Sequence, residues 1–184
     1  DQIDVPPLTE ELRDALLEIS EGFDWSGVSP VIFGSLMEET LSHDERRKGG
    51  MHYTSVKNIH RLIDPLFLDG LKAELEGAEA RPVAGGSRTN ALNKLHDKIA
   101  DLRFLDPACG SGNFLTETYL ELRRIENRIL ADLDKDGQLA LDLGDDINPV
   151  KVSISHFHGI EINGFACAVA RTALWIAEQQ ALDD

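Results

Sequence analysis

The chain has 184 residues, of which 42% are hydrophobic and 28% are charged, a composition typical of a soluble globular domain with its own core. Its 33 acidic residues outweigh its 18 basic ones and give a net charge of −15, so the chain by itself is predicted to bind nucleic acid poorly. No apolar run is long enough to span a membrane, residues 1–7 are no signal peptide, and two cysteines set no disulfide framework. We therefore expect a cytoplasmic protein with no membrane partner. The absence of an initiating Met suggests that the numbering starts inside a longer protein.

The first 48 residues are predicted to form an N-terminal helical region. One helix is expected within residues 8–23, with Thr9 as its N-cap. A second is expected to start at Ser29-Pro30, where a capping residue precedes a proline. Residues 43–48 form a charged run and are interpreted as a solvated connection. The apolar positions at helical spacing are Leu12, Leu16 and Ile19 in the first helix, and Ile32, Phe33 and Leu36 in the second.

Two more helices are predicted before the first strand. One begins at Ser55 and should kink or end near Asp64, because Pro65 interrupts it. The other is short and opens at Thr89. Residues 82–87, rich in glycine and proline, are the best candidate for a mobile loop between them. The apolar positions of these helices are Ile59, Leu62, Ile63 and Leu66, then Leu92, Leu95 and Ile99.

Residues 102–115 are the most informative stretch and read Leu-Arg-Phe-Leu-Asp-Pro-Ala-Cys-Gly-Ser-Gly-Asn-Phe-Leu. The apolar start predicts a short, buried parallel strand, followed by a tight loop from Asp106 and a helix from Asn113. Gly110 and Gly112 allow the backbone to turn sharply and let a ligand lie against it. Backbone N–H groups, the positive end of the helix dipole and the carboxylate at the strand tip would then face one ligand.

Two common ligand classes do not fit this loop. The dinucleotide fingerprint requires a small residue three positions after its second glycine, and here that residue is Leu115. A phosphate-binding P-loop requires Gly-Lys-Ser/Thr, which is absent. Two glycines alone would be as compatible with a turn that merely ends a strand, so the interpretation depends on the whole string.

The remainder of the chain is predicted to continue an α/β pattern. A long helix is expected over residues 114–133, and the second half of residues 150–162 is expected to form the next strand. The polar stretch between them, residues 134–152, is interpreted as an inserted loop with a possible short strand at 139–143. The last predicted helix spans residues 164–180. Its apolar side chains are Phe165, Val169, Leu174, Trp175 and Ile176.

Histidine and cysteine residues suggest no metal site. His96 is expected at the surface or its boundary, and His156 and His158 are interpreted as strand or core residues because no cluster of further ligands accompanies them. Cys109 is interpreted as a small apolar filler beside the glycine turn.

Three motifs give the chain a family resemblance. The string from Asp106 to Phe114 resembles motif I of the amino-group DNA methyltransferases, residues 49–55 resemble their motif X, and residues 157–163 resemble their motif II. Together with residues 29–36, the pattern is most similar to the MmeI-like restriction–modification methyltransferases, over roughly Gly27 to Gln180. The implied fold is helix-rich α/β: the first strands of a Rossmann-like, class I doubly wound sheet. A partial methyltransferase domain over residues 49–184 would follow the helical region.

The resemblance implies S-adenosylmethionine as the cofactor. Glu161 would accept both ribose hydroxyls, Ile162 would lie on the adenine, and Asp106 would hold the ammonium of the methionine tail. Phe114 would shield the sulfonium, while Tyr53 and Thr54 would reach the methionine end of the cofactor. The residues implied to contact the cofactor are Tyr53, Thr54, Asp106, Pro107, Ala108, Cys109, Gly110, Gly112, Phe114, Glu161 and Ile162.

The chain departs from the family in one respect, because the catalytic motif Asn-Pro-Pro-Tyr/Phe does not occur in it. That motif positions the target amine after the base is flipped from the duplex. We therefore expect a portion of an adenine-specific enzyme that holds the cofactor but methylates nothing alone, with DNA bound by other parts of the parent protein. The alternatives are a methyltransferase acting on protein glutamine or RNA, and a non-catalytic protein-interaction module.

Overall fold

The computed structural model describes residues 8–22, 28–40, 54–136 and 149–183. The predicted charged run at 43–48, Tyr53 and the possible strand at 139–143 lie outside these ranges. The elements are α1 (Glu10–Gly22), α2 (Ile32–Thr40), α4 (Val56–Ile63), a π-helical turn (Asp64–Leu68), α5 (Asp69–Glu79), α6 (Ser87–Ala100), β1 (Phe104–Asp106), α7 (Asn113–Lys135), a 3-10 turn (Ile154–His156), β2 (Phe157–Gly159) and α9 (Gly164–Asp183).

The two described strands pair in parallel, as the sequence predicts. Phe104 lies opposite Phe157, and Asp106 lies opposite Gly159. The rings of Phe104 and Phe157 stack with centroids 5.1 Å apart, and Tyr119 of α7 meets Phe157 edge-on. The expectation of a buried β1 is wrong for Leu105, which is 63% exposed, because α7 packs on one face of the strands while Leu105 points to the other.

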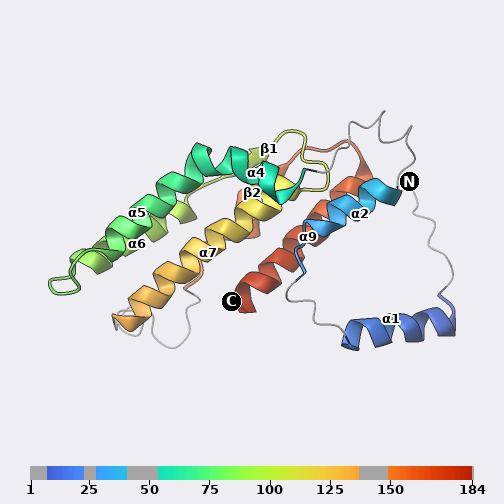
Figure 1. Cartoon of the computed structure of the whole chain (residues 1–184), viewed down its shortest axis with the longest axis horizontal. Coiled ribbons are helices and arrows are strands. Elements are labelled where there is room, and N and C mark those ends of the chain that lie inside the picture. The colour runs from blue at the N-terminus through green and yellow to red at the C-terminus, as the bar shows by residue number, and fades with distance from the viewer. Residues whose placement is uncertain (1–7, 23–27, 41–53, 137–148, 184) are drawn as a thin grey trace.

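Helix α7 is the centre of the fold. The paired helices α5 and α6 lie along one side of it, and α9 lies along the other (Figure 1). Because α7 is covered on several sides, its buried residues go around the helix rather than forming one stripe. Its buried apolar residues are Leu115, Tyr119, Leu122, Ile125, Ile129 and Leu133.

Helix α9 forms where predicted, and it buries a face of small side chains. Phe165 and Trp175, two of its large apolar side chains, are largely exposed. The face that packs instead carries small side chains at helical spacing, which allow α9 to approach α7 and α2 closely. These buried residues are Ala166, Ala170, Ala173, Ala177 and Ala181.

Of the N-terminal helices, α1 follows its predicted start signal, whereas α2 starts later than predicted and exposes part of its predicted apolar face. The hydroxyl of Thr9 accepts a hydrogen bond from Leu12 N at 3.2 Å, so it caps α1 as expected, yet no residue of α1 is buried. Helix α2 begins at Ile32, because Ser29-Pro30 belongs to the turn before it. Val31 and Gly34 face the interior, whereas the predicted core residues Ile32 and Leu36 are exposed.

The α-helical part of α4 ends at Ile63, next to the predicted Asp64, but Pro65 does not interrupt the helical path. The chain passes from α4 through the π-helical turn directly into α5, with Asp69 N donating to Asp64 O across the wider turn. A wider turn accommodates a residue that lacks an N–H and whose ring would strike the preceding turn. The next helix, α6, starts at Ser87, two residues before the predicted Thr89, after Gly86 adopts a φ of 72°.

The expectation that His96 lies at the surface is wrong. His96 is only 3% exposed, and its Nε2 lies 2.7 Å from Oε1 of Glu126, which is fully buried on α7. The Glu126 carboxylate also accepts the backbone N–H groups of Lys151 (2.6 Å) and Val152 (3.0 Å), and it pairs with Arg123. Burial alone would raise the pKa of Glu126, but the hydrogen bonds from His96 and the two amides, with the charge of Arg123, lower it.

A second charged group joins α4 to α7. Nδ1 of His60 lies 2.8 Å from Asp64 Oδ1, and its Nε2 lies 3.0 Å from Glu117 Oε1. The hydrogen bond with Asp64, helped by the one with Glu117, outweighs the effect of burial and raises the pKa of His60. His60 therefore ties the two helices together, most strongly when its imidazole is protonated.

Replacing Glu126 with Ala should cost about 3–5 kcal/mol of unfolding free energy, because Arg123, His96 and two amides lose their shared acceptor. Urea unfolding followed by circular dichroism measures this. The matched control is Glu74→Ala, which removes an exposed partner of Lys98 and should cost less than about 1 kcal/mol. Equal losses in the two variants would contradict the role of Glu126.

The pH dependence of stability should show the contribution of His60. Because its folded pKa is raised, the stabilisation is complete below the unfolded pKa of about 6.5 and is lost as the pH rises through the folded pKa. The melting temperature of the wild type should thus fall towards that of His60→Gln over this window. Asp64→Asn should remove most of the effect, and a difference that stays constant with pH would rule it out.

Candidate cofactor-binding site

The predicted strand, glycine loop and helix are confirmed. β1 ends at Asp106, the loop spans residues 107–112, and α7 begins at Asn113 (Figure 1). Gly110 and Gly112 adopt φ values of 53° and 77°, which side chains disfavour. Gly112 N donates to Cys109 O at 2.8 Å and closes the turn, so the loop has a defined shape before any ligand binds.

Two carboxylates from distant parts of the sequence meet at this loop. Asp106 Oδ1 accepts a hydrogen bond from Ala108 N at 3.0 Å. Glu161 Oε2 accepts one from Gly110 N at 3.0 Å, and its Oε1 accepts one from Asn163 N at 2.8 Å. Each carboxylate oxygen has two lone pairs, so Glu161 retains the capacity to accept two further hydrogen bonds. Both acids therefore brace the loop and remain able to accept donors from a ligand.

The backbone also joins the loop to the end of β2. Ile160 N donates to Asp106 O at 2.9 Å, and Cys109 N donates to Ile160 O at 3.1 Å. These bonds continue the parallel pairing beyond the strands. They explain why Glu161 reaches Gly110 despite a sequence separation far longer than the roughly 20 residues of a compact unit.

The two loop glycines have different surroundings. A Cβ built on Gly112 would lie 2.8 Å from Ala170 Cβ, so this glycine is required both for its φ and for its contact with α9. A Cβ built on Gly110 would meet nothing within 4 Å. The loop is thus packed from behind at Gly112 and open at Gly110, where a ligand could approach the backbone.

The other predicted contact residues surround this opening to different degrees. Ile162 is 95% exposed, so a flat ring could lie against its side chain. Pro107 and Ala108 are also exposed. Phe114 is half-buried and lines a cavity of about 270 Å³. Its other lining residues include Asp106, Pro107, Leu105 and Leu66. Thr54 is half-buried just before α4.

Cys109 packs against the hydrophobic core, as expected of a small filler residue. Burial, reinforced by the negative charges of Asp106 and Glu161, raises the pKa of its thiol. A thiol held in its protonated form is a poor nucleophile, so the site offers no activated cysteine here.

Asn163 has a role that the sequence reasoning missed. Its Oδ1 accepts hydrogen bonds from the backbone N–H groups of Phe165 (2.9 Å) and Ala166 (3.0 Å), so it caps α9. An Asn directly before a helix start is a recognisable capping signal. Because Asn163 N also donates to Glu161, the start of α9 and the acidic residue of the site are fixed together.

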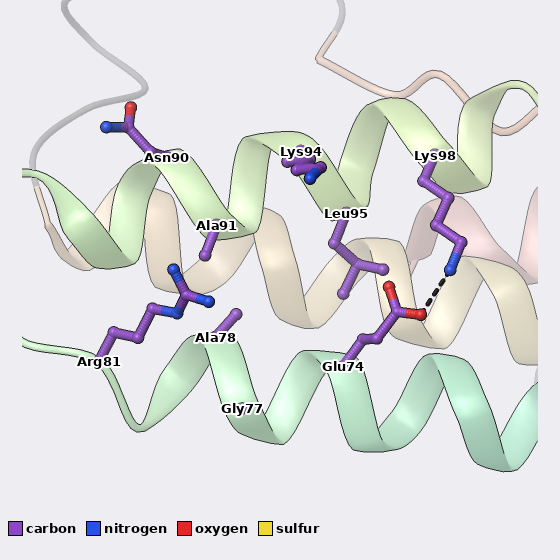
Figure 2. Close-up of a pocket in the computed structure, with 9 residues that line it drawn as sticks. All are labelled: Glu74, Gly77, Ala78, Arg81, Asn90, Ala91, Lys94, Leu95 and Lys98. Carbon is purple, nitrogen blue, oxygen red and sulfur yellow. Dashed lines mark hydrogen bonds and ion pairs between the residues drawn. The ribbon is translucent and has the colours of Figure 1, made fainter.

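A larger cavity, about 610 Å³, lies between α5 and α6 and contains none of the predicted cofactor contacts. Figure 2 shows Arg81, Lys94 and Lys98 around it, with Lys98 paired to Glu74 at 2.5 Å. The helix pair extends away from the glycine loop towards the far end of α7 (Figure 1). This cavity is therefore separate from the candidate site.

Among the described residues, His60, Glu117 and Glu121 bring three potential metal-ligand atoms within 4.8 Å of one another. Glu121 is already paired with Lys72 at 2.8 Å and with Arg124, and these contacts lower its pKa in spite of burial, which alone would raise it. The group is best described as an ion-pair network between helices.

None of the described helices has the length and apolarity needed to cross a bilayer.

Comparisons with known proteins agree on one family. A family profile described as the MmeI DNA-methyltransferase domain matches residues 83–183. DNA methyltransferase A of Bacillus subtilis (strain 168) is 42% identical over 168 residues, which cover 91% of this chain and 18% of that protein. The adenine-specific methyltransferase PglX of Streptomyces coelicolor is 34% identical over 83 residues, or 44% of this chain and 6% of PglX.

A solved structure gives the same result. The type IIL restriction–modification enzyme MmeI, in complex with DNA, matches with a TM-score of 0.78 and 41% identity over 96% of this chain and 22% of the MmeI chain. The chain thus spans about a fifth or less of the length of these relatives. The profile match covers more than half of the chain, including the glycine loop and Glu161. This chain belongs to the MmeI DNA-methyltransferase domain family.

Proposed function

We propose that this chain is the S-adenosylmethionine-binding portion of a DNA methyltransferase that modifies the N6 amine of adenine in a restriction–modification system. The observation that carries the proposal is the bond from Gly110 N to Glu161 Oε2, which joins motif I to motif II beside an open stretch of backbone. The relatives support the reaction and its setting, since PglX is described as adenine-specific and MmeI as a restriction–modification enzyme in complex with DNA.

The two strands would be the first of a Rossmann-like class I sheet. In the described part of the chain, β1 pairs with β2. Leu105 of β1 is exposed, and it lines an apolar cavity of about 270 Å³. Such surface suits further strands and loops of a longer protein. We keep residues 1–48 as the helical region and residues 49–184 as the partial methyltransferase domain, in a cytoplasmic parent.

The residues at the open side of the loop fit the parts of the cofactor. Glu161 would accept the ribose hydroxyls with its remaining lone pairs, and the exposed Ile162 would lie against the adenine. Asp106 would hold the ammonium of the tail, with Phe114 beside the sulfonium and Thr54 and Tyr53 at the methionine end. When bound, the cofactor supplies an electrophilic methyl group.

The chemistry on the target base would belong to other parts of the parent. An exocyclic amine must be held in line with the methyl group by hydrogen-bond acceptors, and no Asn-Pro-Pro-Tyr/Phe occurs between Asp1 and Asp184. The charge of −15 likewise provides few cations for phosphate contacts. DNA would therefore be bound mainly by other regions of the parent protein.

Ligand preference tests the proposal directly. Isothermal calorimetry should show binding of S-adenosylmethionine and its demethylated product but not of NAD. The structural reason is Leu115, which is buried and would lie 3.2 Å from a Cβ at Gly159, where the dinucleotide fingerprint needs a small residue. Binding of NAD without the adenosyl ligands would refute the proposed function.

The two carboxylates should differ in their importance. Glu161→Ala should weaken cofactor affinity by about 2–4 kcal/mol, roughly 30- to 1000-fold, because it strands the ribose hydroxyls and releases Gly110 N. Asp106→Asn should cost less, since the amide oxygen can still accept hydrogen bonds from Ala108 N and the ammonium. Glu76→Ala, on the exposed side of α5, is the control. Normal binding by Glu161→Ala would disprove its assignment.

A further inference from the structure

Helix α2 comes against the glycine loop at a small residue, Gly34. The helix lies along α9 (Figure 1), and Gln180 Nε2 donates to Val28 O at 2.8 Å just before α2 begins. Gly34 of α2 is buried against the loop. A Cβ built on Gly34 would lie 2.6 Å from Asn113 Oδ1 and 2.8 Å from Asn113 Nδ2, and closer still to Ser111 Oγ. Ordinary side-chain contacts are longer than this, so a methyl group at position 34 requires Ser111 and Asn113 to move.

The conformation of α2 does not explain this glycine. Gly34 is helical and is not among the described glycines with positive φ, and glycine costs a helix about 1 kcal/mol relative to alanine. Other helical glycines of the chain lack such contacts: Cβ atoms built on Gly70 and Gly77 of α5 meet nothing within 4 Å. What distinguishes Gly34 is the proximity of the loop.

The loop meets α2 at Ser111 and Asn113, directly after the open residue Gly110. Ser111 Oγ donates to Asn113 Oδ1 at 3.2 Å, and Asn113 is buried as the first residue of α7. Gly110, between this pair and Glu161, faces open space. We propose that Gly34 is a positioning residue, which through Ser111 and Asn113 sets where the glycine loop lies in the cofactor site. The inference rests on the proposed function of that site.

The atoms nearest to position 34 are the side-chain ends of Ser111 and Asn113, which are hydrogen-bonded to each other. A methyl group at position 34 must push Ser111 and Asn113 away by several tenths of an ångström to reach ordinary contact distance. Gly112, which lies between Ser111 and Asn113, is packed so near Ala170 of α9 that a Cβ there would lie 2.8 Å from Ala170 Cβ. We expect such a displacement to reach Gly110, the residue before Ser111, and to alter its bond with Glu161.

The test begins with Gly34→Ala in the full chain, titrated calorimetrically with S-adenosylhomocysteine. We expect the affinity for S-adenosylhomocysteine to fall by about tenfold or more, because small misplacements of binding groups weaken binding strongly. The stability of α2 itself should increase, because alanine has a higher helix propensity than glycine. Gly70→Ala makes the same exchange in a helix with nothing within 4 Å, and it should leave affinity unchanged. Without ligand, the ¹H–¹⁵N signals of Gly110 and Ser111 should shift in Gly34→Ala but not in Gly70→Ala.

Rescue separates positioning from general damage. Adding Ser111→Ala to Gly34→Ala removes the nearest obstructing atom, so affinity should return towards that of the Ser111→Ala single variant. If Gly34→Ala does not fold, Ser111→Thr crowds the same contact from the loop side and should produce the same loss and the same amide shifts.

The outcomes distinguish this inference from the proposed function. Wild-type affinity and unshifted amides in Gly34→Ala, or in Ser111→Thr where the first variant does not fold, would overturn the role of Gly34 and leave the function standing. If the wild type bound neither adenosyl ligand, the proposed function would fail. The amide signals of Gly110 and Ser111 would still decide whether α2 positions the loop.

Discussion

The buried carboxylate of Glu126 holds the parts of this fold in register. It lies on the central helix α7 and accepts hydrogen bonds from His96 of α6 and from the backbone at Lys151 and Val152, where the chain returns towards β2. Its partner Arg123 donates from Nη2 to Ala181 O at 3.0 Å, near the end of α9. One ion pair therefore links four segments. The position of β2, and with it that of Glu161, depends on this buried group.

The two acidic residues of the candidate site have two roles, one in shaping the loop and one proposed in binding the cofactor. Asp106 and Glu161 each accept backbone N–H groups of the loop or its flanks, so the carboxylates shape the loop that they would share with the cofactor. Binding groups held in place before the ligand arrives lose little entropy on binding. The loop and its acids therefore form one unit, in which a change to either part should be felt by the other.

Three glycines allow α2, α9 and β2 to pack closely against the glycine loop. Gly34 brings α2 to Ser111 and Asn113, Gly112 brings the loop to Ala170 of α9, and Gly159 brings β2 to Cys109, whose Sγ would lie 2.5 Å from a Cβ at that position. Each contact is too close for a larger side chain. These three contacts hold the loop closely against its neighbours. Only at Gly110, among the glycines of the loop, would a Cβ meet nothing within 4 Å.

The sequence by itself determined the local elements and the chemistry of the site. The strand–loop–helix at residues 104–113, the parallel partner at Phe157–Gly159 and the cap at Thr9 follow from backbone constraints and short-range periodicity, which neighbouring residues encode. The motif resemblance also brought Asp106, Gly110 and Glu161 to one place, and the structure shows the last two hydrogen-bonded. The turn and the cap need few contacts between distant segments, whereas the strand pairing and the bond from Gly110 to Glu161 join remote segments that the motifs identified.

Only the tertiary structure decided which faces are buried and which polar groups meet. His96 is buried because its partner Glu126 lies on another helix, and α9 packs by its alanines because a small-residue face allows the closest approach to α7. Pro65 stays within a helix because a π-helical turn accommodates it, and Gly34 matters because of a loop far along the chain. No local pattern encodes such pairings, since their free energy arises from packing between segments that are remote in sequence.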